Sequence, residues 1–68
     1  MKKRWPKNMV LQNADRDTMA FQVSRKHNKV SIDYYVNYEF VQTVETDIDN
    51  GAELYYNAID NEGFYEAF

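Results

Sequence analysis

The sequence predicts a small all-β domain, an antiparallel meander of four to five strands around one long, bent central strand. The central strand is predicted at residues 29–48, where one alternating set of positions is mostly apolar and the other carries acids and tyrosines. Such an alternation in β-branched and aromatic residues is typical of a strand with one buried face. A straight strand of this length would extend roughly 65 Å. Because a compact chain of 68 residues has a radius of gyration of about 11 Å, we expect the strand to bend or break near residues 37–39.

Residues 18–25 predict a second strand, which pairs with the first part of the central strand. Apolar and polar side chains alternate in it, and residues 26–29 suit a tight connection. A hairpin centred on His27 and Asn28 sets apolar residues opposite one another at each step: Met19 with Val36, Phe21 with Tyr34, and Val23 with Ile32. A slip of one residue would place each pair on opposite faces. Residues 8–12 could add a short edge strand, followed by a turn at 13–16.

Residues 49–60 have two interpretations. In the first, Asp49-Asn50-Gly51 is a three-residue hairpin loop with glycine in the left-handed position. This hairpin pairs mostly apolar residues: Ile48 with Ala52, Thr46 with Leu54, and Val44 with Tyr56. In the second, Asn50 caps a short helix at 51–60 and Glu53 completes a capping box. We favour the hairpin, and keep an α+β fold with this helix as the alternative.

The predicted strands end with a turn at 60–63 and a last short strand or docked aromatic tail at 64–68. A strongly bent sheet of this size resembles a small barrel or half-barrel of the SH3-like kind, which implies an architecture and no function. Residues 1–7 are predicted to form a flexible basic arm, because Pro6 blocks regular pairing and the segment has no periodicity. Residues 8–68 form a single small β domain.

No residue constellation predicts an enzyme, a cofactor or a metal site. The chain has no cysteine, and the only histidine, His27, is expected in an exposed turn. The segment Asp47–Gly51 superficially resembles a calcium loop, but its glycine falls at position five, where an EF-hand has it at position six. No segment is long enough to span a membrane, and the apolar run Met9–Leu11 is too short for a signal peptide. We therefore expect a soluble cytoplasmic protein.

The strongest candidate for partner binding is an acidic, tyrosine-rich face. In the favoured hairpin Asp47 lies opposite Glu53, and facing like charges destabilise a sheet, so folding alone would not select that pair. Tyrosine is enriched at protein interfaces, where it supplies rigid contact area with a polar tip. The predicted face consists of Asp33, Tyr35, Glu39, Glu45, Asp47, Glu53 and Tyr55.

A basic surface gives an alternative. Residues 1–29 contain all eight Lys and Arg residues and two acids, whereas residues 30–68 contain nine acids and no Lys or Arg. Basic side chains with an interleaved aromatic can hold phosphates and stack a base. The candidate nucleic-acid-binding residues are Lys2, Lys3, Arg4, Trp5, Lys7, Arg25, Lys26 and Lys29.

These features lead to a hypothesis of a small, non-enzymatic inhibitor. Its small size, lack of cysteine and acidic face are similar to those of phage-encoded inhibitors of host enzymes, such as anti-CRISPR, anti-restriction and uracil-glycosylase-inhibitor proteins. The likeness is one of composition and covers no motif. It implies that the acidic face blocks a basic, nucleic-acid-binding surface of a host protein in the host cytoplasm. The alternatives are a nucleic-acid-binding accessory protein and a small homo-oligomeric structural protein, for instance a homodimer, paired through exposed strand edges.

Overall fold

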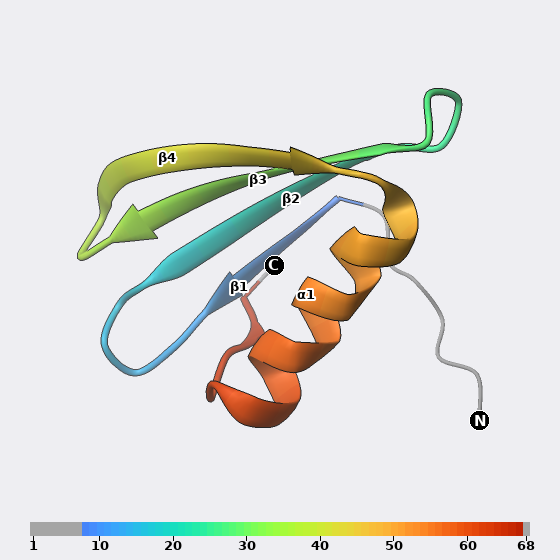
Figure 1. The fold of residues 1–68 in the computed structure, drawn as a ribbon. Helices are drawn as coiled ribbons and strands as arrows, with labels where there is room; N and C mark the ends of the chain where they lie inside the picture. The colour runs from blue at the N-terminus through green and yellow to red at the C-terminus, as the bar shows by residue number, and fades with distance from the viewer. Residues whose placement is uncertain (1–7, 68) are drawn as a thin grey trace.

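The computed structural model describes residues 8–67, which form one open antiparallel sheet of five strands and one helix (Figure 1). The elements are β1 (Met9–Gln12), β2 (Thr18–Ser24), β3 (Lys29–Val36), β4 (Glu39–Thr46), α1 (Ile48–Asn61) and β5 (Tyr65–Glu66). The strand order is β4-β3-β2-β1-β5, so β4 and β5 are the two edges of the sheet. The antiparallel meander is confirmed for β1–β4. The sheet is open, and it does not close into an SH3-like barrel.

Residues 29–48 do not form one central strand. They fold back at Asn37 and Tyr38, within the segment where a break was expected, and make the β3–β4 hairpin. Both turn residues have positive φ, 53° for Asn37 and 71° for Tyr38. Two consecutive residues with φ above zero are what a type I′ turn requires, and this turn suits the right-handed twist of the paired strands. The prediction of a break is therefore confirmed, while the single long strand is wrong.

The β2–β3 hairpin is shifted by two residues from the predicted register. Phe21 lies opposite Ile32 and Met19 opposite Tyr34. A shift of two keeps every side chain on its predicted face, so the apolar pattern is equally satisfied in both registers. The turn decides between them, because the amide of Asn28 donates to the carbonyl of Arg25 at 3.3 Å and Asn28 adopts a φ of 50°. The hairpin is thus centred one residue earlier than predicted.

Residues 48–61 form a helix, so the favoured hairpin at 49–51 is wrong and the alternative α+β fold is the observed one. The cap is Asp47, three residues before the predicted Asn50, and its carboxylate accepts a hydrogen bond from the Asn50 amide at 2.8 Å. Gly51, Tyr55 and Ala58 are the buried residues of α1, at the spacing of one helical face. The helix ends near Gly63, whose φ of 76° suits glycine.

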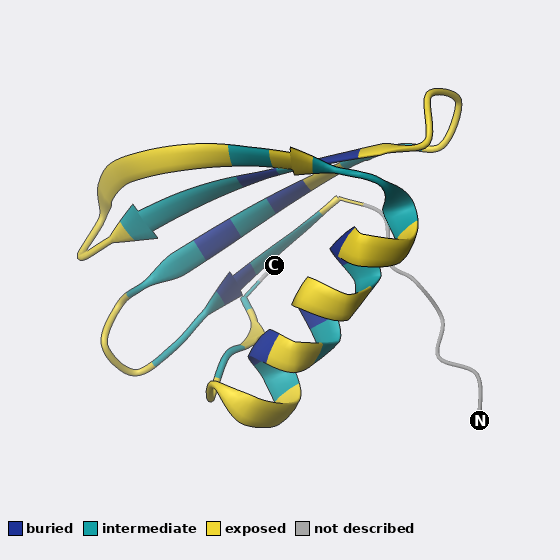
Figure 2. Ribbon diagram, in the orientation of Figure 1, coloured by how far each residue is buried: buried dark blue, intermediate teal, exposed yellow. Residues whose placement is uncertain are grey.

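The hydrophobic core lies between α1 and the face of β1–β3 that the helix covers (Figure 2). It consists of Leu11, Met19, Phe21, Val30, Ile32, Tyr55 and Ala58. The rings of Phe21 and Tyr55 meet edge to face, with centroids 5.7 Å apart. Since the core uses one face of the sheet, the other face and most of β4 remain open to solvent.

Replacing Asp47 with alanine is expected to lower the free energy of unfolding by about 1 kcal/mol, because the change leaves a helical amide without its side-chain acceptor. Urea unfolding followed by circular dichroism measures the loss. Glu53→Ala is the matched control, since Glu53 is an exposed acid inside the same helix, and its effect should stay within about 0.5 kcal/mol. Equal effects of the two substitutions would contradict the assigned cap.

Candidate functional site

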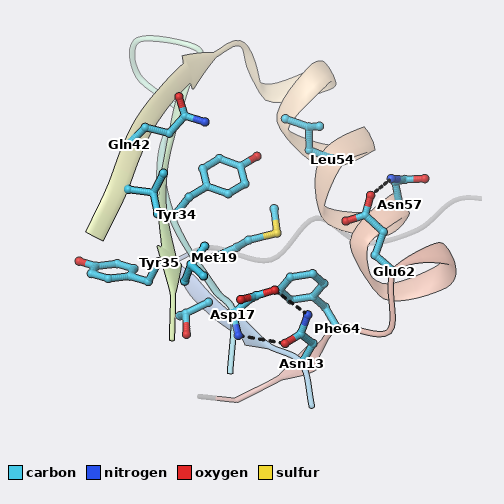
Figure 3. Close-up of a pocket in the computed structure, with 13 residues that line it drawn as sticks. Asn13, Asp17, Met19, Tyr34, Tyr35, Gln42, Leu54, Asn57, Glu62 and Phe64 are labelled. Carbon is cyan, nitrogen blue, oxygen red and sulfur yellow. Dashed lines mark hydrogen bonds between the residues drawn. The ribbon is translucent and has the colours of Figure 1, made fainter. Parts of the chain in front are cut away.

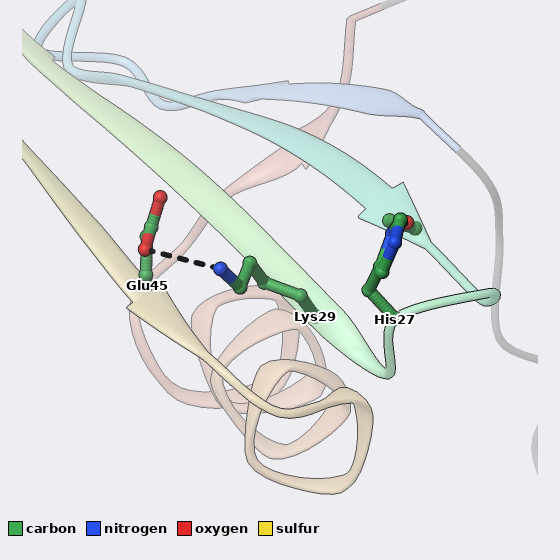
Figure 4. Close-up of polar contacts among 4 residues, drawn as sticks. His27, Lys29 and Glu45 are labelled. Atoms are coloured by element: carbon green, nitrogen blue, oxygen red, sulfur yellow. Dashed lines mark hydrogen bonds and ion pairs between the residues drawn. The ribbon is translucent and has the colours of Figure 1, made fainter.

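The predicted acidic face is divided among several surfaces. Asp33, Tyr35 and Glu45 do lie together, on the side of the sheet opposite α1, because they alternate with the inward-facing Val30 and Ile32 and their cross-strand partners. The Thr43 hydroxyl donates to the Asp33 carboxylate at 2.7 Å across β3 and β4. Lys29 Nζ lies 3.7 Å from Glu45 Oε1, so this acid is paired with one of the predicted basic residues (Figure 4).

The other predicted residues of that face lie elsewhere. Glu39 is exposed where β4 begins. Asp47 caps α1 and Glu53 lies within it, so these two acids do not face each other across a hairpin. Tyr55 is only 3% exposed, which makes its assignment to an outer face wrong. Its hydroxyl donates to the Glu66 carboxylate, and burial together with this hydrogen bond raises the pKa of Tyr55 well above its ordinary value. Tyr55 therefore has a structural role.

The tip of the β3–β4 hairpin carries an exposed apolar surface that the sequence pattern assigned largely to the core. We define this hairpin-tip surface by four residues with exposed fractions of 53–64%: Val36, Tyr38, Phe40 and Val41. A register irregularity at Tyr34 and Tyr35 shifts the pairing, so that Tyr35 lies opposite Phe40. Their ring centroids are 5.7 Å apart, in an edge-to-face arrangement. The hairpin-tip surface thus adjoins Asp33 and Tyr35 on the open face.

The exposure of Val36, Tyr38 and Phe40 was not predicted because residues 29–48 were expected to form one strand, without a hairpin turn. In an uninterrupted strand, Val36, Tyr38 and Phe40 continue the apolar face of Val30 and Ile32. Once Asn37 and Tyr38 form the turn, the chain reverses and these side chains pass beyond the end of the core. Asn37 was the sequence signal for this turn, because asparagine is depleted in strands and tolerates positive φ.

The predicted basic surface is described only in part. Arg25 and Lys26 are exposed in the β2–β3 turn, and residues 1–7 lie outside the described residues. At the end of β2, Ser24 Oγ lies 3.1 Å from Nδ1 of His27 in the turn, at an exposed position. Within residues 8–67, no group of three or more His, Cys, Asp or Glu side chains could hold a metal ion. No helix in this part of the chain is long and apolar enough to cross a membrane.

A pocket of about 490 Å³ opens between the C-terminal half of α1 and the neighbouring ends of β2, β3 and β4 (Figure 3). Its apolar lining includes Met19, Leu54 and Phe64, and its polar lining includes Asp17 and Glu62. The remaining lining residues are Asn13, Thr18, Tyr34, Tyr35, Val36, Val41, Gln42 and Asn57. Tyr35, Val36 and Val41 connect this pocket with the open face and the hairpin-tip surface.

Burial raises the pKa of Tyr34 above its ordinary value, and the negative charge of Glu62 raises it further. The Tyr34 hydroxyl is therefore protonated at neutral pH and is able to donate a hydrogen bond inside the pocket. In Figure 3 this hydroxyl points from β3 toward the helix side of the pocket, where Leu54 lies.

Comparison of this chain with models of protein families, with curated proteins and with solved structures found no match.

Proposed function

We propose that this chain is a small protein-binding domain that uses the hairpin-tip surface, together with Tyr35 and the acids Asp33 and Glu39, to contact a basic surface of another protein. One observation carries the proposal. Tyr38 has a φ of 71°, in the left-handed region, and its side chain is 64% exposed. That backbone conformation costs an L-residue roughly 1–2 kcal/mol, and glycine is the usual residue at this position of such a turn.

A strained, exposed aromatic residue contributes little to folding, so its side chain is best explained by a contact outside the domain. Tyrosine is among the residues that dominate the binding energy of protein interfaces. Val36, Phe40 and Val41 extend the apolar area around Tyr38, and Glu39 lies at the first position of β4 within it. An apolar centre with charged residues at its rim is the usual anatomy of a protein interface.

The charge of the domain supports a basic partner. Residues 8–67 contain all eleven acids of the chain but only four basic residues, Arg16, Arg25, Lys26 and Lys29. Complementary charge accelerates association and suppresses wrong partners. Proteins that bind nucleic acids have strongly basic surfaces, so a nucleic-acid-handling protein suits the hairpin-tip surface. By occupying the phosphate-binding surface of such a partner, this chain would inhibit the partner.

Replacing Tyr38 with glycine is expected to weaken partner binding at least tenfold while the free energy of unfolding stays the same or rises by up to about 1 kcal/mol. The partner is isolated from a cell lysate with the intact chain as bait, and binding of the purified partner is then measured by biolayer interferometry. Glu53→Lys on α1 is the control for net charge, and Glu39→Lys is its matched counterpart at the hairpin.

We expect Glu39→Lys to weaken binding more than Glu53→Lys. Unchanged affinity of Tyr38→Gly, or an equal loss for both charge reversals, would contradict the proposal. Sedimentation over a concentration series comes first, because a second copy pairing with the exposed edge of β4 would occupy the same surface. In that case the partner is the chain itself, and Tyr38→Gly should lower the association constant of the oligomer.

A further inference from the structure

We propose that the pocket between α1 and β2–β4 binds an arginine side chain supplied by the partner protein. The proposal deepens the proposed function and rests on it for the source of the arginine, since the pocket shares Val36 and Val41 with the hairpin-tip surface.

The volume and the lining of the pocket suit a long side chain with an apolar stem. Its volume of about 490 Å³ lies within the range of small-ligand sites. Met19 from β2, Leu54 from α1 and Phe64 after α1 provide apolar lining on several sides (Figure 3). The three methylene groups of an arginine side chain pack well on such a surface while the charged head reaches a polar rim.

Two of the residues that line the pocket are acidic. Asp17 precedes β2 and Glu62 follows α1, so two segments far apart in the sequence each contribute a carboxylate. Asp17 Oδ2 accepts a hydrogen bond from the Asn13 side-chain amide at 3.4 Å, and Glu62 Oε2 accepts one from that of Asn57 at 3.1 Å (Figure 3). These neutral amides orient the carboxylates without neutralising their charge.

Neither carboxylate has a cationic partner in the described part of the chain. No Lys or Arg of residues 8–67 forms an ion pair with Asp17 or Glu62, although Arg16 is adjacent to Asp17 in the sequence. The negative charge of Glu62 is strong enough at the pocket to contribute to the raised pKa of Tyr34. A cation from outside the domain would therefore be attracted to this pocket.

The combination of aromatic rings and carboxylates in the pocket lining favours a guanidinium over an ammonium. The guanidinium is planar, stacks on aromatic rings and donates two parallel hydrogen bonds to a carboxylate. The rings of Tyr34 and Phe64 and the carboxylates of Asp17 and Glu62 all belong to the pocket lining. An ammonium is a strongly hydrated point charge and gains less from the same surroundings.

The test is a titration of the intact chain with N-acetyl-arginine N-methylamide, followed by amide chemical shifts in ¹⁵N–¹H NMR spectra. We expect saturable shifts at Met19, Tyr34, Leu54 and Glu62, with the uncharged citrulline analogue binding at least about tenfold more weakly. Asp17→Asn and Glu62→Gln should each weaken arginine binding severalfold, and their spectra report whether the fold is kept. Glu53→Gln is the matched control, because it removes the same charge at an exposed position of α1 outside the pocket lining.

Equal binding of the arginine and citrulline analogues, or an equal effect of Glu53→Gln and Glu62→Gln, would overturn the proposal. Binding of the lysine analogue as tight as that of the arginine analogue would overturn the assignment to a guanidinium. The titration contains only the chain and the small-molecule probe. A probe that does not bind therefore contradicts the arginine pocket alone, whereas the proposed partner binding is tested separately. Conversely, loss of partner binding in Tyr38→Gly together with unchanged probe binding would separate the two surfaces.

Discussion

Replacing Phe21 with alanine is expected to leave the domain largely unfolded at 25 °C. Phe21 is 1% exposed and packs edge to face against Tyr55 of α1, so it joins the helix to the middle of the sheet. A buried Phe→Ala substitution costs about 3–5 kcal/mol. A domain of this length has a total stability of roughly 3–10 kcal/mol, so this one substitution consumes much or all of it.

Phe40→Ala is the matched control, because it makes the same chemical change at a side chain that is 59% exposed. We expect its free energy of unfolding to stay within about 1 kcal/mol of wild type, with a small loss from the contact between Phe40 and Tyr35. Circular dichroism and urea unfolding measure both variants. A loss below about 1 kcal/mol for Phe21→Ala would contradict the assigned core.

Replacing Gly51 with alanine is expected to destabilise the domain, although helix propensity alone predicts the opposite. Within a helix, alanine is favoured over glycine by about 1 kcal/mol. At Gly51, however, a Cβ atom would lie 2.8 Å from Val30 Cγ2 and 2.9 Å from Val30 Cβ. Val30 is fully buried, so neither residue moves away easily. Overpacking of this kind costs about 1–3 kcal/mol, and we expect it to exceed the gain in propensity.

A double-mutant cycle separates the two effects. Val30→Ala alone removes buried atoms and should destabilise the domain, but it also removes the two Cγ atoms that lie 2.8 and 3.0 Å from a Cβ at residue 51, while the Cβ of residue 30 stays at 2.9 Å. Gly51→Ala should therefore cost less in the Val30→Ala background than in the wild type, which gives a measurable coupling energy. Urea unfolding of the four proteins measures it. An increase in stability for Gly51→Ala alone would contradict the close approach of α1 to β3.

The candidate site was predictable only in part, because exposure depends on where the chain turns. Asp33, Tyr35 and Glu45 were correctly placed together on an outer face, since they alternate with buried residues of the same strands. Tyr55 was misplaced because the strand pattern puts it on the outer face, whereas the helix pattern puts it on the buried face of α1. Tyr38 and Phe40 were assigned to the core because an unbroken period of two continues through the turn. The pocket combines residues 13–19, 34–42 and 54–64, and no local pattern links these segments.

The sequence by itself predicted strands at residues 8–12 and 18–25, the face that the second of them buries, and the break near residues 37–39, whereas the first strand, expected at an edge, lies between β2 and β5. These features follow from the alternation of side chains along each strand and from the length of the chain, both of which are read from the sequence without any tertiary contact. Only the tertiary structure decided the β2–β3 register and the conformation of residues 48–61. A shift of two residues leaves every side chain on the same face of the sheet, so the register is set by the turn at Arg25–Asn28. Residues 48–61 satisfy both periods in part, and the helix prevails because Gly51, Tyr55 and Ala58 together bury one face against β1–β3.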